Sequence, residues 1–164
     1  MEDLTEAFLL LARESDGALS IESVNINDIV HEEIERAEPF NRIKNIPISI
    51  TEHHEMNINA SDKVLSVLLG NLIRNAILYT ESGTIDITIT DNSVIIEDSG
   101  IGMSKEEIDK IFMPHYRAKS DVNIGHGVGL TIVKRLSERF HWPLKVRSTP
   151  HKGTRIEIFL KNPG

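Results

Sequence analysis

Two asparagines four residues apart, Asn71 and Asn75, are the first side chains of this sequence that could do chemistry. They lie in LLGNLIRNAILYT, which is otherwise almost entirely apolar. Residues four apart share one face of a helix, so both amides would project from the same side of a buried helix. Leaving such a group unpaired costs on the order of 1 to 3 kcal/mol, so either the core or a ligand must satisfy the pair. Two amides that cap a neighbouring strand are an equally good explanation of the pair alone.

An acidic residue followed by a Gly-x-Gly turn, in EDSGIGM, is the second candidate. The Asp98 carboxylate can accept a hydrogen bond from the exocyclic amine of adenine, whereas guanine presents a carbonyl oxygen at that edge. Gly100 and Gly102 allow positive φ and close approach of the backbone to a planar base. By itself the D-x-G-x-G pattern is weak, and a plain turn is its more frequent meaning.

A third cluster, GHGVGL, places Gly125, Gly127 and Gly129 directly before a segment with helical periodicity. Bare backbone amides at a helix N-terminus attract anions, and phosphate is their natural ligand. The spacing differs from both common nucleotide fingerprints, and a helix start with packing glycines is the alternative. Five of the ten glycines of the chain fall in these two clusters, which favours a ligand site.

The elements that must position these clusters follow from hydrophobic periodicity and capping residues. Pro39 is expected to end the first helix after residue 17, and Ser61 and Asp62 to cap the next, which should be buried. The helices are expected at residues 27–38, 63–79, 104–112 and 126–140, and the strands near 23–26, 46–51, 56–59, 84–90, 93–98, 142–148 and 153–160. Because no regular βαβ rhythm is present, we predict an α+β fold with a mixed, mostly antiparallel sheet covered on one side by helices.

Composition limits the class of protein. The 164 residues, 40% hydrophobic and 26% charged, suit one domain with a real core. With 18 basic and 25 acidic residues, the net charge of −7 argues against nucleic acid as a partner. No apolar run approaches the length of a membrane span, and the absence of cysteine excludes disulfides and thiolate metal sites. These features fit a cytoplasmic domain.

The first residues, MEDLTEAFLLLARESDG, have the pattern of an amphipathic helix that ends at Gly17. Leu4, Phe8 and Leu11 lie on one face of it. Because so short a helix would be marginal alone, we expect it to be the end of a longer helix in a larger protein.

Five segments in one order resemble the N, G1, F, G2 and G3 boxes of sensor histidine kinases: NLIRNAILYT, EDSGIGM, IFMPHYRAKS, GHGVGLTIVKRL and KGTRIEIFL. The resemblance implies a two-layer α/β sandwich of the Bergerat type that binds ATP and Mg²⁺. A lid at about 113–125 would close over the nucleotide. Residues 1–17 would end a helix of the dimerisation domain, and 18–164 would form the catalytic domain.

The resemblance also assigns roles to individual residues. Asn75 would hold the magnesium ion, and Asn71 would support the phosphate or metal shell. Asp98 would recognise adenine, Thr154 would lie near the same end, and Arg117 would meet the γ-phosphate, where its charge suits the transition state. The other nucleotide-binding residues it implies are Tyr79, Gly100, Gly102, Lys119, Gly125, His126, Gly127, Val128, Gly129 and Leu130, and Phe112 would anchor the lid.

Asn71 also bears on the reaction. Related ATPases such as gyrase and heat-shock chaperones carry at this position a glutamate, which can activate water as asparagine cannot. A histidine nucleophile is already a competent base and needs positioning and charge neutralisation instead. The resemblance therefore implies transfer of the γ-phosphoryl group to a histidine on a dimerisation domain absent from this chain. The full-length protein would be a homodimer, usually anchored in the cell membrane, that acts on a response regulator.

Some residues depart from the family pattern. Leu78 replaces a frequent lysine, and Lys119 or Arg117 could compensate for that lost phosphate contact. His115 replaces the usual phenylalanine of the lid. His31, in HEEI, superficially resembles a phosphoacceptor, but it lacks the basic residue and proline of that motif and is expected on a solvated helix face. A non-catalytic nucleotide sensor and a superfamily ATPase are the alternative functions.

Overall fold

The computed structural model describes residues 20–110 and 129–161. The helix expected at residues 1–17 and the lid expected at about 113–125 lie outside these ranges. None of the helices in the described ranges combines the length and apolar character that crossing a bilayer requires.

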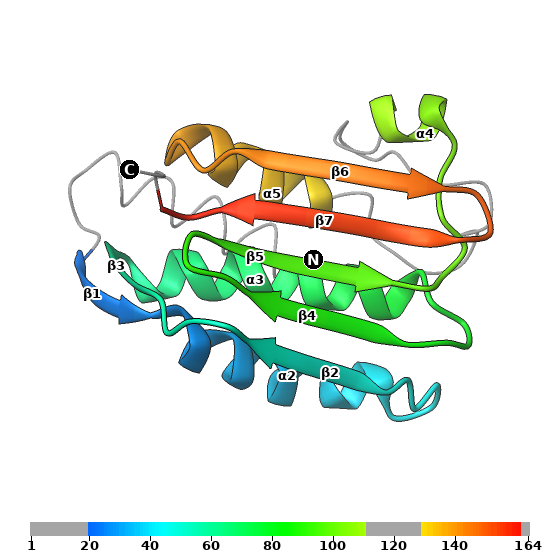
Figure 1. Cartoon of the computed structure of the whole chain (residues 1–164), viewed down its shortest axis with the longest axis horizontal. Helices are drawn as coiled ribbons and strands as arrows, with labels where there is room; N and C mark the ends of the chain where they lie inside the picture. Colours follow the sequence, from blue (N-terminus) through cyan, green and yellow to red (C-terminus); the bar gives the residue numbers. More distant parts are fainter. Residues whose placement is uncertain (1–19, 111–128, 162–164) are drawn as a thin grey trace.

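A five-stranded mixed sheet forms one layer of the molecule, in the order β2-β4-β5-β7-β6 (Figure 1). β2 (Ile48–Glu52) runs parallel to β4 (Ile85–Ile89), and the other neighbours are antiparallel: β4 with β5 (Ser93–Asp98), β5 with β7 (Gly153–Phe159), and β7 with β6 (Leu144–Thr149). The mixed, mostly antiparallel sheet predicted from the sequence is confirmed.

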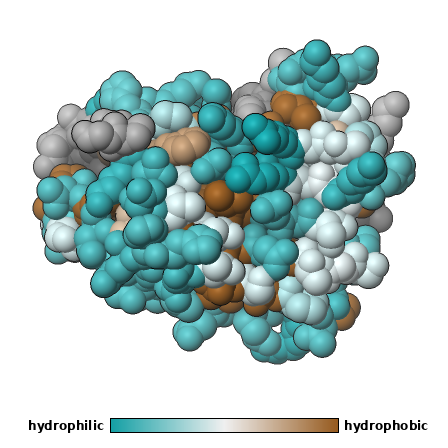
Figure 2. Space-filling view, viewed as in Figure 1, coloured by the Kyte–Doolittle hydropathy of each residue, from teal (hydrophilic) through white to brown (hydrophobic). Residues whose placement is uncertain are grey.

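Three helices cover one face of this sheet: α2 (Ile26–Asn41), α3 (Asp62–Leu78) and α5 (Gly129–Arg139) (Figure 1). A short helix, α4 (Lys105–Lys110), contacts β6. β1 (Glu22–Asn25) and β3 (Asn57–Ala60) form a separate antiparallel pair. The opposite face of the main sheet is exposed and largely hydrophilic (Figure 2). The structure is thus the expected two-layer α+β fold.

The central helix, α3, is buried as its composition predicts. The Ser61 side chain caps it by accepting a hydrogen bond from the backbone amide of Val64. Most of its side chains are buried, and it packs against α2, α5 and β5. On the sheet side, Ile85, Ile87 and Ile89 of β4 point into the same core, as their alternation with polar residues indicates.

The predicted end of the first helix at Pro39 was wrong, because α2 continues to Asn41. A proline near the end of a helix removes one hydrogen bond without preventing the next residues from keeping helical dihedrals. The Asn41 side chain ends the helix instead. Its Nδ2 donates to the carbonyl of Ile46 at 2.8 Å, and its Oδ1 accepts from the amide of Ile46 at 2.8 Å.

Candidate functional site

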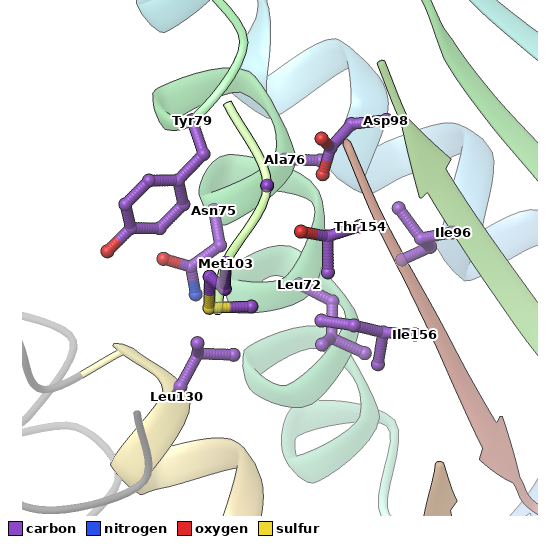
Figure 3. A pocket seen from close by; sticks show the side chains of 11 residues that line it. Leu72, Asn75, Ala76, Tyr79, Ile96, Asp98, Met103, Leu130, Thr154 and Ile156 are labelled. Carbon is purple, nitrogen blue, oxygen red and sulfur yellow. The ribbon is translucent and has the colours of Figure 1, made fainter. Parts of the chain in front are cut away.

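A pocket lies between α3 and the carboxyl-terminal part of β5 and is closed by β7, by α5 and by the turn after β5 (Figure 3). Its walls are apolar except at a few positions, which is the usual make-up of a small-molecule site. The lining residues are Leu72, Asn75, Ala76, Tyr79, Ile96, Asp98, Gly102, Met103, Leu130, Thr154 and Ile156.

Six residues that the sequence assigned to nucleotide binding meet in this pocket: Asn75, Tyr79, Asp98, Gly102, Leu130 and Thr154. Asn71 and Gly100 lie beside it without forming part of its lining, and Gly129 is the first residue of α5. The remaining expected residues lie outside the part of the chain that the structure describes: Phe112, His115, Arg117, Lys119, Gly125, His126, Gly127 and Val128.

The two asparagines of α3 differ in their surroundings. Asn71 is 4% exposed, and its Nδ2 donates to the carbonyl of Val67, one turn earlier, at 2.7 Å. Asn75 is half-buried, and its amide points into the pocket (Figure 3). Of the two asparagines, Asn75 is therefore the one whose side chain faces a ligand in the described pocket. The Asn71 amide is instead bonded within α3, to the backbone of the preceding turn.

Asp98 ends β5 and is half-buried in the pocket wall. Its Oδ1 accepts a hydrogen bond from the amide of Gly100 at 2.9 Å. Burial raises the pKa of the Asp98 carboxyl to about 6, and the backbone amides of Gly100 and Thr154 offset part of this effect. At neutral pH the pocket thus contains an ionised acceptor in mainly apolar surroundings, where a hydrogen-bond donor on a ligand would be favourable.

The glycines of the D-x-G-x-G turn are required by contacts within the protein. A Cβ at Gly100 would lie 2.0 Å from the carbonyl oxygen of Tyr79, which also accepts a hydrogen bond from the amide of Ile101 at 3.0 Å. Gly102 has a φ of +67°, and a Cβ there would lie 2.0 Å from the carbonyl oxygen of Thr149. The turn is therefore held between the end of α3 and the β6–β7 connection, and this fixes Asp98 beside the pocket.

Sequence patterns did not identify several residues that form the site. The apolar lining residues, such as Met103 and Ile156, have the same character as ordinary core residues. Ser148, which hydrogen-bonds to Thr154, carries no local signal. The pairing of Ser148 with Thr154 on neighbouring strands would have indicated its role, but strand register is a property of the tertiary structure.

The chemistry of the site limits how it could hold a metal ion. Among residues 20–110 and 129–161, no group of three or more His, Asp or Glu side chains could hold one. Asn75 offers a neutral carbonyl oxygen, which suits a Mg²⁺ ion whose other ligands are phosphate oxygens and water. The pocket fits a metal that arrives with a nucleotide.

Comparison with known proteins agrees with this geometry. The family model for histidine kinase-, DNA gyrase B- and HSP90-like ATPases matches residues 60–164, which include the whole lining of the pocket. The heme sensor protein HssS of Staphylococcus saprophyticus is 32% identical over 168 residues, which cover 98% of this chain and 36% of that protein. The sensor histidine kinase ZraS of Salmonella typhimurium is 30% identical over 149 residues, 87% of this chain and 31% of that protein.

A solved structure shares the fold. The crystal structure of full-length ShkA in complex with AMPPNP aligns over 99% of this chain and 35% of that chain, with a TM-score of 0.78 and 24% identity. This chain spans about a third of the length of the curated relatives HssS and ZraS. It belongs to the histidine kinase-, DNA gyrase B- and HSP90-like ATPase family, as a catalytic ATP-binding domain of the histidine kinase type.

Proposed function

We propose that this chain binds Mg-ATP in the described pocket and transfers the γ-phosphoryl group to a histidine on a dimerisation domain of the same protein. The observation that carries the proposal is the Asp98 carboxylate in the wall of an apolar pocket that Asn75 also enters. The planar ring of adenine can pack against the apolar walls, and its amine group can donate to the Asp98 carboxylate.

The base end of the site lies around Asp98. The adenine ring packs against apolar lining residues, and its exocyclic amine donates to the Asp98 carboxylate. Tyr79, at the C-terminal cap of α3, borders the same space. The phosphates then extend toward the start of α5 at Gly129, where a helix N-terminus favours negative charge.

Asn75 is the residue of the described pocket that fits the magnesium role. A bound ion would neutralise charge on the phosphates. Asn71 keeps the helix turn below Asn75 in place through its hydrogen bond to the Val67 carbonyl. Asn75 therefore binds and orients the nucleotide, and Asn71 supports the phosphate or metal shell from one helical turn away. Neither amide can act as a base at neutral pH, so neither activates water.

The transfer step then needs only an acceptor in line with the γ-phosphate. An imidazole nitrogen of the acceptor histidine forms the bond to phosphorus, the bond from phosphorus to the β,γ-bridging oxygen breaks, and ADP leaves with the electron pair. We assign the surrounding positive charge to Arg117 and Lys119, and the remaining phosphate contacts to Gly125, His126, Gly127 and Val128, on the basis of the sequence alone.

The same proposal includes the domain organisation of the full-length protein. Residues 1–17 end a helix of the dimerisation domain, residues 18–164 form the catalytic domain, and a lid occupies about 113–125. The full-length kinase is a homodimer anchored in the cell membrane, and its phosphohistidine serves a response regulator.

Incubation with γ-labelled ATP and Mg²⁺ tests this function. We expect the isolated chain to bind ATP without labelling itself, and acid-labile label to appear on the dimerisation domain of the full protein when that domain is added. Asn75→Ala should abolish transfer, whereas Asn59→Ala, at an exposed position of β3, should not.

Two results would contradict the proposal. ATP binding with no label on the added dimerisation domain would indicate a nucleotide sensor. Rapid steady-state hydrolysis that Asn71→Ala abolishes would indicate an ATPase.

A further inference from the structure

Three polar side chains form a row across three neighbouring strands at the base end of the pocket. Asp98 of β5 is paired with Thr154 of β7, and Thr154 is paired with Ser148 of β6. Directly opposed residues of antiparallel strands carry their side chains on the same face of the sheet. Asp98 and Thr154 line the pocket, and their oxygens lie on its inner side (Figure 3). Ser148 does not form part of the lining.

The hydroxyl group of Ser148 has three polar neighbours. It accepts a hydrogen bond from the backbone amide of Met103 at 2.7 Å. Its oxygen is 2.8 Å from the carbonyl oxygen of Gly153 and 2.8 Å from Oγ1 of Thr154. A serine hydroxyl has one proton and two acceptor sites, so these three contacts use its full capacity.

Only one arrangement of protons satisfies all three contacts. The Gly153 carbonyl can only accept, so the Ser148 proton must point to it. The Met103 amide can only donate, and it takes one of the acceptor sites on Ser148. The Thr154 hydroxyl must therefore donate its proton to the other site. The Thr154 hydroxyl can then act toward a ligand only as a hydrogen-bond acceptor.

We infer that Ser148 is a specificity-determining residue, because it makes Thr154 an acceptor toward the nucleotide base. This inference rests on the proposed binding of ATP. A 6-amino purine presents a donor to the two acceptors Asp98 and Thr154, whereas a 6-oxo purine presents an acceptor to them. Ser148 thus increases the preference for the 6-amino base without touching the ligand.

Isothermal titration of the chain with ATP and with ITP tests the inference, since these nucleotides differ in the 6-substituent and the protonation of the adjacent ring nitrogen. In Ser148→Ala the Thr154 proton is released and can be donated to a 6-oxo group. We expect the ratio of the ITP Kd to the ATP Kd to fall by about 3- to 10-fold, the effect of one hydrogen bond. A purely structural loosening around Met103 would weaken both nucleotides and leave the ratio unchanged.

Two further variants complete the test. In a Thr154→Val background, Ser148→Ala should leave the ratio as it is, because no hydroxyl proton is left to redirect. Ser93→Ala removes another buried serine hydroxyl, at the opposite end of β5 from Asp98, and should leave the ratio unchanged.

An unchanged ratio in Ser148→Ala, or a fall of equal size in the Thr154→Val background, would overturn the inference. These outcomes are distinct from failure of the proposed function, which would appear as a wild-type chain that binds neither nucleotide.

Discussion

At the scale of single residues, Asp98 is the group whose ionisation matters most to the site. Its folded-state pKa of about 6 lies above the ordinary value of 3.8, because burial disfavours the charged form. The folded protein therefore holds this proton more tightly than the unfolded chain does. The stability that this gives is fully present below pH 3.8 and is lost as the pH rises through about 6.

The same titration should control nucleotide affinity. An amine donor favours the ionised carboxylate, so below pH 6 binding must first expel a proton. We expect ATP affinity to fall by up to about tenfold per pH unit below this value. Titration calorimetry at several pH values from 5 to 8 measures the effect.

Asp98→Asn is the control for this prediction, because it keeps an acceptor oxygen and cannot titrate. The ionisation of ATP itself is common to both proteins, so the difference between their pH profiles isolates Asp98. Parallel profiles for wild type and variant would contradict the assigned role.

At the scale of elements, the C-terminal end of α3 is capped by a positive charge from another part of the chain. The helix has no basic residue in its last turn. Lys44, in the loop after α2, supplies one: its Nζ donates to the carbonyls of Ile77 and Leu78 at 3.1 and 3.0 Å and lies 3.4 Å from Glu81. A cation at a helix C-terminus satisfies the free carbonyls and interacts favourably with the helix dipole. Lys44 thereby stabilises the C-terminal end of α3, the helix that carries Asn75.

We expect Lys44→Met to lower the free energy of unfolding by about 1 to 2 kcal/mol, because the side chain is only 18% exposed and makes two hydrogen bonds. Urea denaturation measures the change. Arg42→Met is the control, two residues away: its ion pair with Glu38 joins side chains that are 71% and 60% exposed, so it should lose less than about 0.5 kcal/mol. Equal losses in the two variants would rule out the proposed helix cap.

At the scale of the whole molecule, the pocket joins the two layers. Its lining comes from α3 and α5 in the helical layer and from β5 and β7 in the sheet. A ligand there contacts segments that are far apart in the chain, so the unfolded state offers no equivalent site. Ligand binding should therefore stabilise the domain as a whole.

We expect Mg-ATP at 100 times its Kd to add about 2.7 kcal/mol to the free energy of unfolding. For a domain of this size the melting temperature should rise by several degrees, which calorimetry can record. Asp98→Ala should lose most of the shift at the same nucleotide concentration, whereas Asn59→Ala should retain it. A full shift in Asp98→Ala would show that the nucleotide binds elsewhere.

Local patterns in the sequence were sufficient for much of the fold. The apolar composition of residues 63–79 predicted a buried helix, and the alternation of isoleucines in β4 predicted a strand with one face in the core. These predictions succeed because periodicity and capping act over a few residues. Pro39 shows the limit, because the end of α2 depends on hydrogen bonds between Asn41 and Ile46.

The candidate site was determined in part by sequence and in part by tertiary structure. The sequence alone indicated Asn75, Asp98 and the glycines because their motifs occur together in one order, although neither the asparagine pair nor the D-x-G-x-G turn is specific by itself. Strand pairing decided the row of Asp98, Thr154 and Ser148, and chain packing brought Lys44 to the end of α3. The physical reason is that these contacts join residues more than thirty positions apart or depend on strand register, which no local pattern encodes.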